Sequence, residues 1–172
     1  MTQDHVHYDR STIVLHWLTA LLVTLLWLGG QTIDVLGRDV AVSLRSLHIT
    51  LGITLAVVLA IRVSWRLSRG RSLPDAESGV LQAAARVTHY VLYLAAGATI
   101  ALGLTAAYFR GDVVFGLLAF PGGARDLGRT IKGYHALAAN FVLILAGLHA
   151  AAALFHHYVL RDGVLRRMFP SG

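Results

Sequence analysis

Four long apolar stretches, separated by polar segments, set the pattern of this chain. They cover residues 13–30, 47–67, 87–107 and 134–158, and a helix needs about 20 apolar residues to cross the hydrocarbon core of a bilayer. The arginines and lysines inside the stretches are Arg62 and Arg66, both in the second one, and Arg62 lies where its side chain can snorkel towards an interface. The pattern predicts an all-α protein, a four-helix transmembrane bundle, with the lipid bilayer as its surroundings.

Two segments between these stretches are too short or too polar to span. Residues 113–121 are apolar and bounded by Gly111, Gly122 and Gly123, which favours an interfacial or re-entrant piece of the third connection. Residues 68–77, with Pro74, form a polar connector. Because neither segment has the character of a domain linker, we expect one domain over residues 1–172.

Composition supports the membrane interpretation and narrows the chemistry. Charged residues make up 14% of the chain, against about 25% in soluble domains, which is too little to cover a water-facing surface. The chain has no cysteine, so disulfides, iron–sulfur clusters, thiolate zinc sites and covalently attached c-type haem are excluded. The first apolar stretch lacks a small-residue cleavage pattern and is therefore not a cleavable signal peptide. We expect no nucleic-acid partner.

Orientation follows from the lysines and arginines. With four helices, both termini and the middle connection share one side, which carries nine of these residues, and the opposite side carries six. The positive-inside rule then predicts that both termini of a multi-pass membrane protein lie in the cytoplasm.

Four of the histidines inside the apolar stretches lie at matched depths. His135 and His149 are 14 residues apart, so on one helix their imidazoles point the same way and lie about 21 Å apart along the axis. By depth, His16 pairs with His149 on the cytoplasmic side, and His48 pairs with His135 on the outer side. A porphyrin between facing helices takes one axial nitrogen from each side, so two haems are predicted.

Other interpretations of these histidines remain open. Any one of them can be a packing residue that is hydrogen-bonded between helices, whereas zinc would need four ligands at one point. His89 is an alternative ligand on the cytoplasmic side, or a packing or quinone-pocket residue. His156 is a candidate quinone contact with His157 and Tyr158, or part of an interfacial anchor belt. His5 and His7 are expected to be solvent-exposed in a polar leader.

Several short motifs resemble the bacterial cytochrome b561 family. They are Leu15-His16-Trp17, Leu47-His48 followed by Gly52, Lys132-Gly133-Tyr134-His135, and Gly147-Leu148-His149-Ala150. The resemblance covers nearly the whole chain, and it implies a four-helix membrane cytochrome with two b haems held by His16, His48, His135 and His149. The chain end from His156 to Met168, and Tyr108-Phe109-Arg110-Gly111, are similar to a compact stand-alone branch of that family.

For that branch, the resemblance implies oxidation of superoxide at the outer face and transfer of the electrons through both haems to ubiquinone, with no obligate protein partner. An alternative is a haem b electron-transfer subunit between the quinone pool and a hydrogenase- or dehydrogenase-type partner. A third, non-redox possibility is a small membrane scaffold or transporter.

The basic residues of the third connection fit an anionic substrate. Residues 108–132 contain three arginines and one lysine against two aspartates, and positive charge at an entry raises the local concentration of anions. We expect Lys132, one turn before His135, and Arg110 to steer superoxide. The alternative is that these charges pair with haem propionates or lipid phosphates. For Arg62, interfacial anchoring and propionate pairing are both open.

Overall fold

The computed structural model describes residues 7–33, 35–70 and 79–170. Four α-helices form its body: α1 (Arg10–Ile33), α2 (Arg38–Ser68), α3 (Gly79–Arg110) and α4 (Arg125–Phe155). Two short strands, β1 (Val113–Val114) and β2 (Leu118–Ala119), connect α3 to α4. A π-helix, η1 (His156–Leu160), and a 3₁₀ turn, η2 (Leu165–Met168), follow α4. The all-α prediction is confirmed, and part of the predicted polar connector, residues 71–78, lies outside the described residues.

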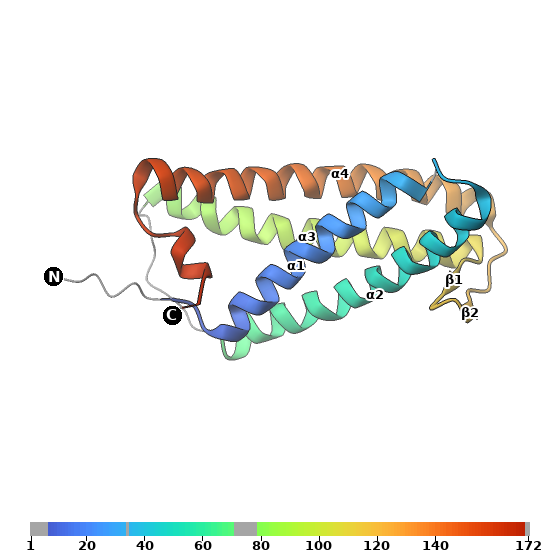
Figure 1. The fold of residues 1–172 in the computed structure, drawn as a ribbon, viewed down its shortest axis with the longest axis horizontal. Coiled ribbons are helices and arrows are strands. Elements are labelled where there is room, and N and C mark those ends of the chain that lie inside the picture. Colours follow the sequence, from blue (N-terminus) through green and yellow to red (C-terminus); the bar gives the residue numbers. More distant parts are fainter. Residues whose placement is uncertain (1–6, 34, 71–78, 171–172) are drawn as a thin grey trace.

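The helices run up, down, up and down along one long axis, so both chain ends lie at one end of the bundle and the strands at the other (Figure 1). We call these the terminal end and the hairpin end. Helix α1 packs mainly along α2, and α3 packs mainly along α4, while the two pairs contact each other less. The bundle is therefore two helix pairs with a looser seam between them.

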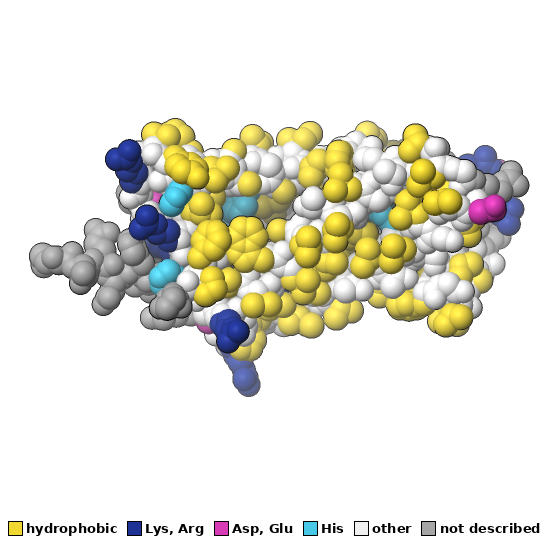
Figure 2. Space-filling model, in the orientation of Figure 1, with side chains coloured by type: hydrophobic (Ala, Val, Ile, Leu, Met, Phe, Trp, Pro, Cys, Tyr) yellow, Lys and Arg dark blue, Asp and Glu magenta, His cyan; other side chains and the backbone are white. Residues whose placement is uncertain are grey.

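The outer surface of the helices is apolar, as a bilayer requires. All four helices are long and apolar enough to cross a membrane, and their exposed residues include Leu21, Leu94 and Ile144. Figure 2 shows apolar side chains over the length of the bundle, with lysine and arginine gathered at its two ends. In water so large an apolar surface would drive aggregation, but in lipid it is the favourable arrangement, and the protein is a multi-pass membrane protein.

Polar side chains within the helices bond to their own backbone. Thr19 Oγ1 donates to the carbonyl of Leu15 at 2.6 Å, and Thr99 Oγ1 donates to that of Ala95 at 2.8 Å. Such bonds to the preceding turn give these hydroxyls a partner in a medium that offers no water.

The short apolar segment of the third connection is a β-hairpin. Val113 pairs with Ala119 and Val114 with Leu118, and the turn has positive φ at Phe115 and Gly116 (54° and 70°), as in a type I′ turn. The backbone N–H groups of these two residues donate to Thr50 Oγ1 and Ser46 Oγ of α2 at 3.1 and 2.9 Å. The hairpin is thus fastened to α2, with the exposed side chain of Leu117 at its tip.

The two chain ends are tied together at the terminal end. The Trp17 indole N–H donates to the carbonyl of Met168 at 2.9 Å, and the Tyr8 N–H donates to that of Arg167 at 3.1 Å. His7 Nδ1 lies 2.9 Å from the Phe169 carbonyl. The expectation that His7 is solvent-exposed is therefore wrong: its ring is half-buried against the C-terminal segment, a contact between distant parts of the chain that local polarity does not reveal.

Candidate functional site

Three histidines meet near the terminal end. The ring centroids of His16, on α1, and His149, on α4, are 6.3 Å apart with an interplanar angle of 72°. The third histidine, His89 on α3, has its ring centroid 5.3 Å from that of His149. We call His16 and His149 the terminal pair.

A second pair lies near the hairpin end. His48, on α2, and His135, on α4, have ring centroids 6.1 Å apart and nearly perpendicular planes, at 88°. Because α4 is continuous from Arg125 to Phe155, its two histidines are separated by about 21 Å along the helix. The structure thus brings together both histidine pairs that the sequence predicts, and we call this one the hairpin pair.

The spacing within each pair suits one metal ion between two imidazoles. An imidazole–metal bond is about 2 Å, and a ring nitrogen lies roughly 1 Å from its centroid, so two rings on opposite sides of an ion have centroids about 6 Å apart. The observed separations of 6.3 and 6.1 Å match this distance. The 5.3 Å between His89 and His149 is shorter, which makes His89 the poorer partner.

Hydrogen bonding at the hairpin pair leaves one ring nitrogen of His135 for a metal. His135 Nδ1 lies 2.9 Å from the Thr99 carbonyl, to which it can only donate. A ligating histidine usually donates its second nitrogen in this way, which fixes the tautomer and the ring orientation. The buried Nδ1 of His48 has no hydrogen-bond partner among the described residues.

Glycines on the neighbouring helices make room for the hairpin pair. A Cβ on Gly103, on α3, would lie 2.9 Å from Cε1 of His135, and one on Gly30, on α1, would lie 3.4 Å from Cε1 of His48. Sequence reasoning did not identify either position. At Gly52 and Gly147, the glycines of the histidine motifs, a Cβ would meet nothing within 4 Å. The adjacent Gly29 and Gly30 were a readable signal, whereas the role of Gly103 depends on how α3 is rotated.

Arg62 does not snorkel towards an interface. Its guanidinium faces into the bundle, donates to His16 Nδ1 at 2.8 Å, and lies over the Tyr93 ring at 5.3 Å. These contacts from α1 and α3 hold the side chain inward, and a reading from depth alone could not anticipate them.

Both ends of the seam have basic cavities. At the terminal end, a space of about 50 Å³ is lined by the terminal pair, His89, Arg62, Arg66, Trp65 and Tyr93, among others. Its enclosed part has room for water only, so a porphyrin here would extend into the loosely packed seam between the helix pairs. At the hairpin end, a cavity of about 360 Å³ is lined by one aspartate, Asp112, and four arginines: Arg45, Arg110, Arg125 and Arg129.

The two residues predicted to steer an anion lie at the hairpin end. The Arg110 guanidinium donates to Asp112, whose carboxylate also lies 3.8 Å from Arg45, so part of its charge is compensated. Lys132 is half-buried on α4, one turn before His135. The excess of arginine over aspartate around the cavity still leaves this end positive.

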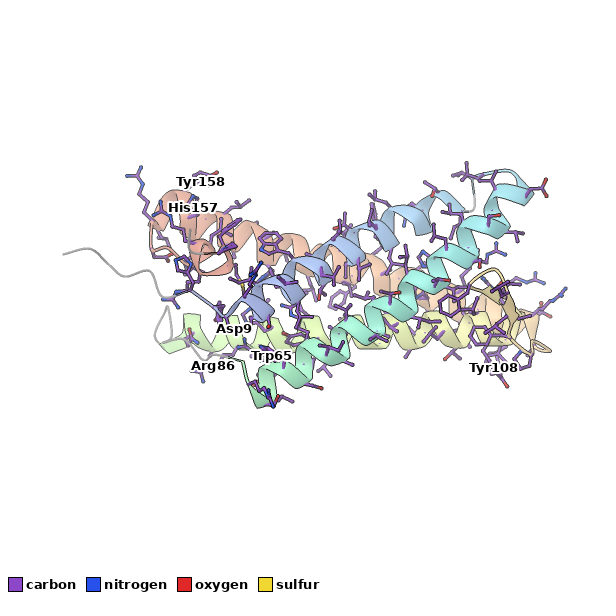
Figure 3. The ribbon with its side chains drawn as sticks, turned by 60° about the horizontal axis from the view of Figure 1, so that its bottom comes forward. Asp9, Trp65, Arg86, Tyr108, His157 and Tyr158 are labelled. Atoms are coloured by element: carbon purple, nitrogen blue, oxygen red, sulfur yellow. The ribbon has the colours of Figure 1, made fainter. Side chains whose placement is uncertain are left out.

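The end of α4 carries a histidine–carboxylate pair. His156 Nδ1 is hydrogen-bonded to Asp162 Oδ2, across the π-helix η1 and the left-handed Arg161. Partial burial raises the pKa of Asp162, but the bonds from His156 and from the Val164 N–H outweigh this and hold the pKa below its usual value. Figure 3 shows His157 and Tyr158 at the same end, beyond the body of the helix. Asp162 was not anticipated as a partner of His156.

Comparison with known proteins gives consistent matches over almost the full length. Residues 7–171 match the family described as prokaryotic cytochrome b561. The chain is 34% identical to a probable superoxide oxidase of Yersinia pestis (97% of this chain and 98% of the relative). It is 32% identical to a cytochrome b562 of Cereibacter sphaeroides (98% of each). It is 28% identical to cytochrome b561 homolog 1 of Escherichia coli (95% and 97%).

Proposed function

Because the chain belongs to the prokaryotic cytochrome b561 family of membrane electron-transfer proteins, which bind b-type haem, we propose that it oxidises superoxide at one face of the membrane and reduces ubiquinone with the electrons. Two superoxide anions would yield two molecules of dioxygen. One quinone would take up the two electrons and two protons to form the quinol.

The observation that carries this proposal is that the terminal pair and the hairpin pair lie at separate depths of the bundle. His16 and His149 would hold one haem b and His48 and His135 the other, with centroid separations suited to an intervening iron. When bound, the haems supply one-electron redox chemistry. The chain's own part is to fix the imidazoles, as the Thr99 carbonyl does for His135, and to exclude water with apolar helices.

The hairpin end would receive superoxide. The arginines around its cavity and Lys132 provide a positive surface, which raises the capture rate of an anion. The name of the Yersinia pestis relative supports superoxide as the substrate. By the positive-inside rule this end faces the periplasm, and both termini lie in the cytoplasm of an inner-membrane protein.

The terminal end would reduce ubiquinone. His156 is oriented by Asp162, to which its Nδ1–H donates. When Nε2 also carries a proton, that nitrogen can donate a hydrogen bond to a quinone carbonyl and pass the proton on. His157 and Tyr158, whose ring centroids are 4.8 Å apart, would line the entry to the quinone site. The His89 neighbourhood is the alternative location for the quinone.

The direct test is to add superoxide to purified protein and to follow haem reduction, and then haem reoxidation by ubiquinone, in the visible spectrum. We expect Lys132→Gln to slow the first step about three- to tenfold at low salt and to flatten its salt dependence. We expect His156→Ala to slow only the second step. Arg161→Gln, which changes an exposed charge at the terminal end, is the control for the first step.

The result also separates this proposal from the runner-up. Reduction by quinol but not by superoxide, together with co-purification of a large redox partner, would identify an electron-transfer subunit of a hydrogenase- or dehydrogenase-type complex. Two of the relatives are named only as cytochromes, which is compatible with that alternative.

A further inference from the structure

Arg62 is a cation inside a membrane-spanning helix, and no carboxylate among the described residues forms an ion pair with it. Among the described residues that line the terminal cavity there are two arginines, Arg62 and Arg66, and no carboxylate. The nearby Asp9 uses its carboxylate on the Thr12 N–H and hydroxyl and on the Trp65 indole N–H, at 2.6 to 3.0 Å. A buried or membrane-embedded cation without a counter-charge is costly, so an anionic group is expected here in the working protein.

The hydrogen bond from Arg62 to His16 conflicts with metal ligation by His16. A guanidinium can only donate, so His16 Nδ1 accepts at 2.8 Å and the single proton of the neutral ring lies on Nε2. An axial imidazole has the opposite arrangement, with the second nitrogen donating, as His135 does towards Thr99. For His16 to ligate through Nε2, Arg62 must therefore release Nδ1.

The ligand that would require this release also supplies the missing anion. A b-type haem carries two propionate carboxylates, and arginine is the side chain best suited to bind a carboxylate through two parallel hydrogen bonds. The Tyr93 ring, 5.3 Å from the guanidinium carbon, keeps the charge directed into the seam. Building on the haem proposed at the terminal pair, we infer that Arg62 binds a propionate of that haem, and that Arg62 occupies His16 Nδ1 until this propionate arrives.

The experiment compares two porphyrins that differ only in these carboxylates. Haem-free protein, carrying His135→Ala so that the terminal pair alone binds, is titrated with haem b and with haem b dimethyl ester, whose propionates are neutral. We expect Arg62→Gln to weaken haem b binding about ten- to a hundredfold and to leave the ester affinity unchanged. Arg62→Lys retains part of the affinity, and Arg69→Gln, which changes an exposed arginine directly after the same helix, is the control.

A second measurement uses the full chain loaded with haem. Removing a cation beside a haem favours the oxidised, more positive iron, so Arg62→Gln is expected to lower one midpoint potential and leave the other in place. Equal loss of haem b and ester binding would mean that Arg62 only supports packing, and unchanged haem b binding would mean that it pairs with no propionate; either result overturns the inference. Since no superoxide or quinone is present, failure of the proposed activity would not produce either result.

Discussion

At the scale of residues, the absence of one Cβ leaves room for an imidazole of the hairpin pair. A Cβ on Gly103 would lie too close to the His135 ring for the ring to keep its position. A Cβ on Gly97, which is on the same helix α3, would meet nothing within 4 Å. The glycine at position 103 therefore allows His135 to adopt its observed position. The same residue scale includes the Asp162 carboxylate, which determines the orientation of His156.

We predict that Gly103→Ala impairs the hairpin pair and that Gly97→Ala does not. The new methyl group would lie 2.9 Å from Cε1 of His135. Such overpacking costs about 1–3 kcal/mol, which would weaken haem retention about five- to a hundredfold. The haem-to-protein ratio after purification measures this directly. Equal ratios in the two variants would show that His135 can move without losing its function.

We predict that Asp162 makes stability depend on pH in the acid range. Its pKa in the folded protein lies below the usual 3.8, so the stabilisation is complete above that value and is lost as the pH falls through the lower, folded pKa. The difference in Tm between the wild type and Asp162→Asn therefore shrinks as the pH is lowered below 3.8. Asp126→Asn, whose side chain is 97% exposed, is the control, and a pH-independent difference would contradict the assignment.

At the scale of elements, α4 is the helix on which both pairs depend. His149 and His135 face α1 and α2 respectively, so each pair joins α4 to a different helix of the other helix pair. A ligand change on α4 therefore tests one site at a time.

We predict that His149→Ala removes haem from the terminal pair and leaves the hairpin pair loaded, because His48 and His135 keep their contact. His89→Ala, at the same depth, is expected to keep both haems. Haem content and the visible spectrum of the purified variants provide the measurement. If the first variant keeps full haem content and the second loses half, His89 is the ligand instead.

The sequence could predict the features that follow from local patterns, but not those that depend on contacts between distant segments. Helix number, depth and the pairing of the four histidines follow from hydropathy and from a 14-residue spacing. The inward turn of Arg62, the Asp162–His156 bond and the fit of Gly103 against His135 depend on how helices are rotated about their axes. That rotation is set by packing between segments far apart in the chain, which no local pattern records. The third connection was recognised as non-spanning, but its hairpin rests on bonds to Ser46 and Thr50 of α2.

At the scale of the whole molecule, the two ends differ, and under the proposed function this difference would set the direction of electron flow. The hairpin end presents the arginine-lined cavity, whereas the terminal end carries His156 with Asp162 and both chain ends (Figure 1). Donor and acceptor sites would thus lie on opposite faces.

We predict that this orientation can be read by labelling. The chain contains no cysteine, so Leu117→Cys, at the hairpin tip, and Arg69→Cys, at the terminal end, each introduce one exposed thiol. A membrane-impermeant maleimide added to spheroplasts is expected to label the first and not the second, and both react after lysis. The reverse pattern would place the termini outside, and the unaltered protein is the blank.

The continuity of α4 also has a consequence for how the protein is made. Both imidazole pairs take one member from this last helix, and the segment that closes the terminal end, Leu165–Met168, follows it in the chain. Helix α4 is synthesised after the first three helices, so neither imidazole pair is complete while only these three are in the membrane. Under the proposed function, cofactor loading at both depths would therefore wait for the synthesis of α4, and a nascent chain stopped before α4 would be a membrane protein without a site.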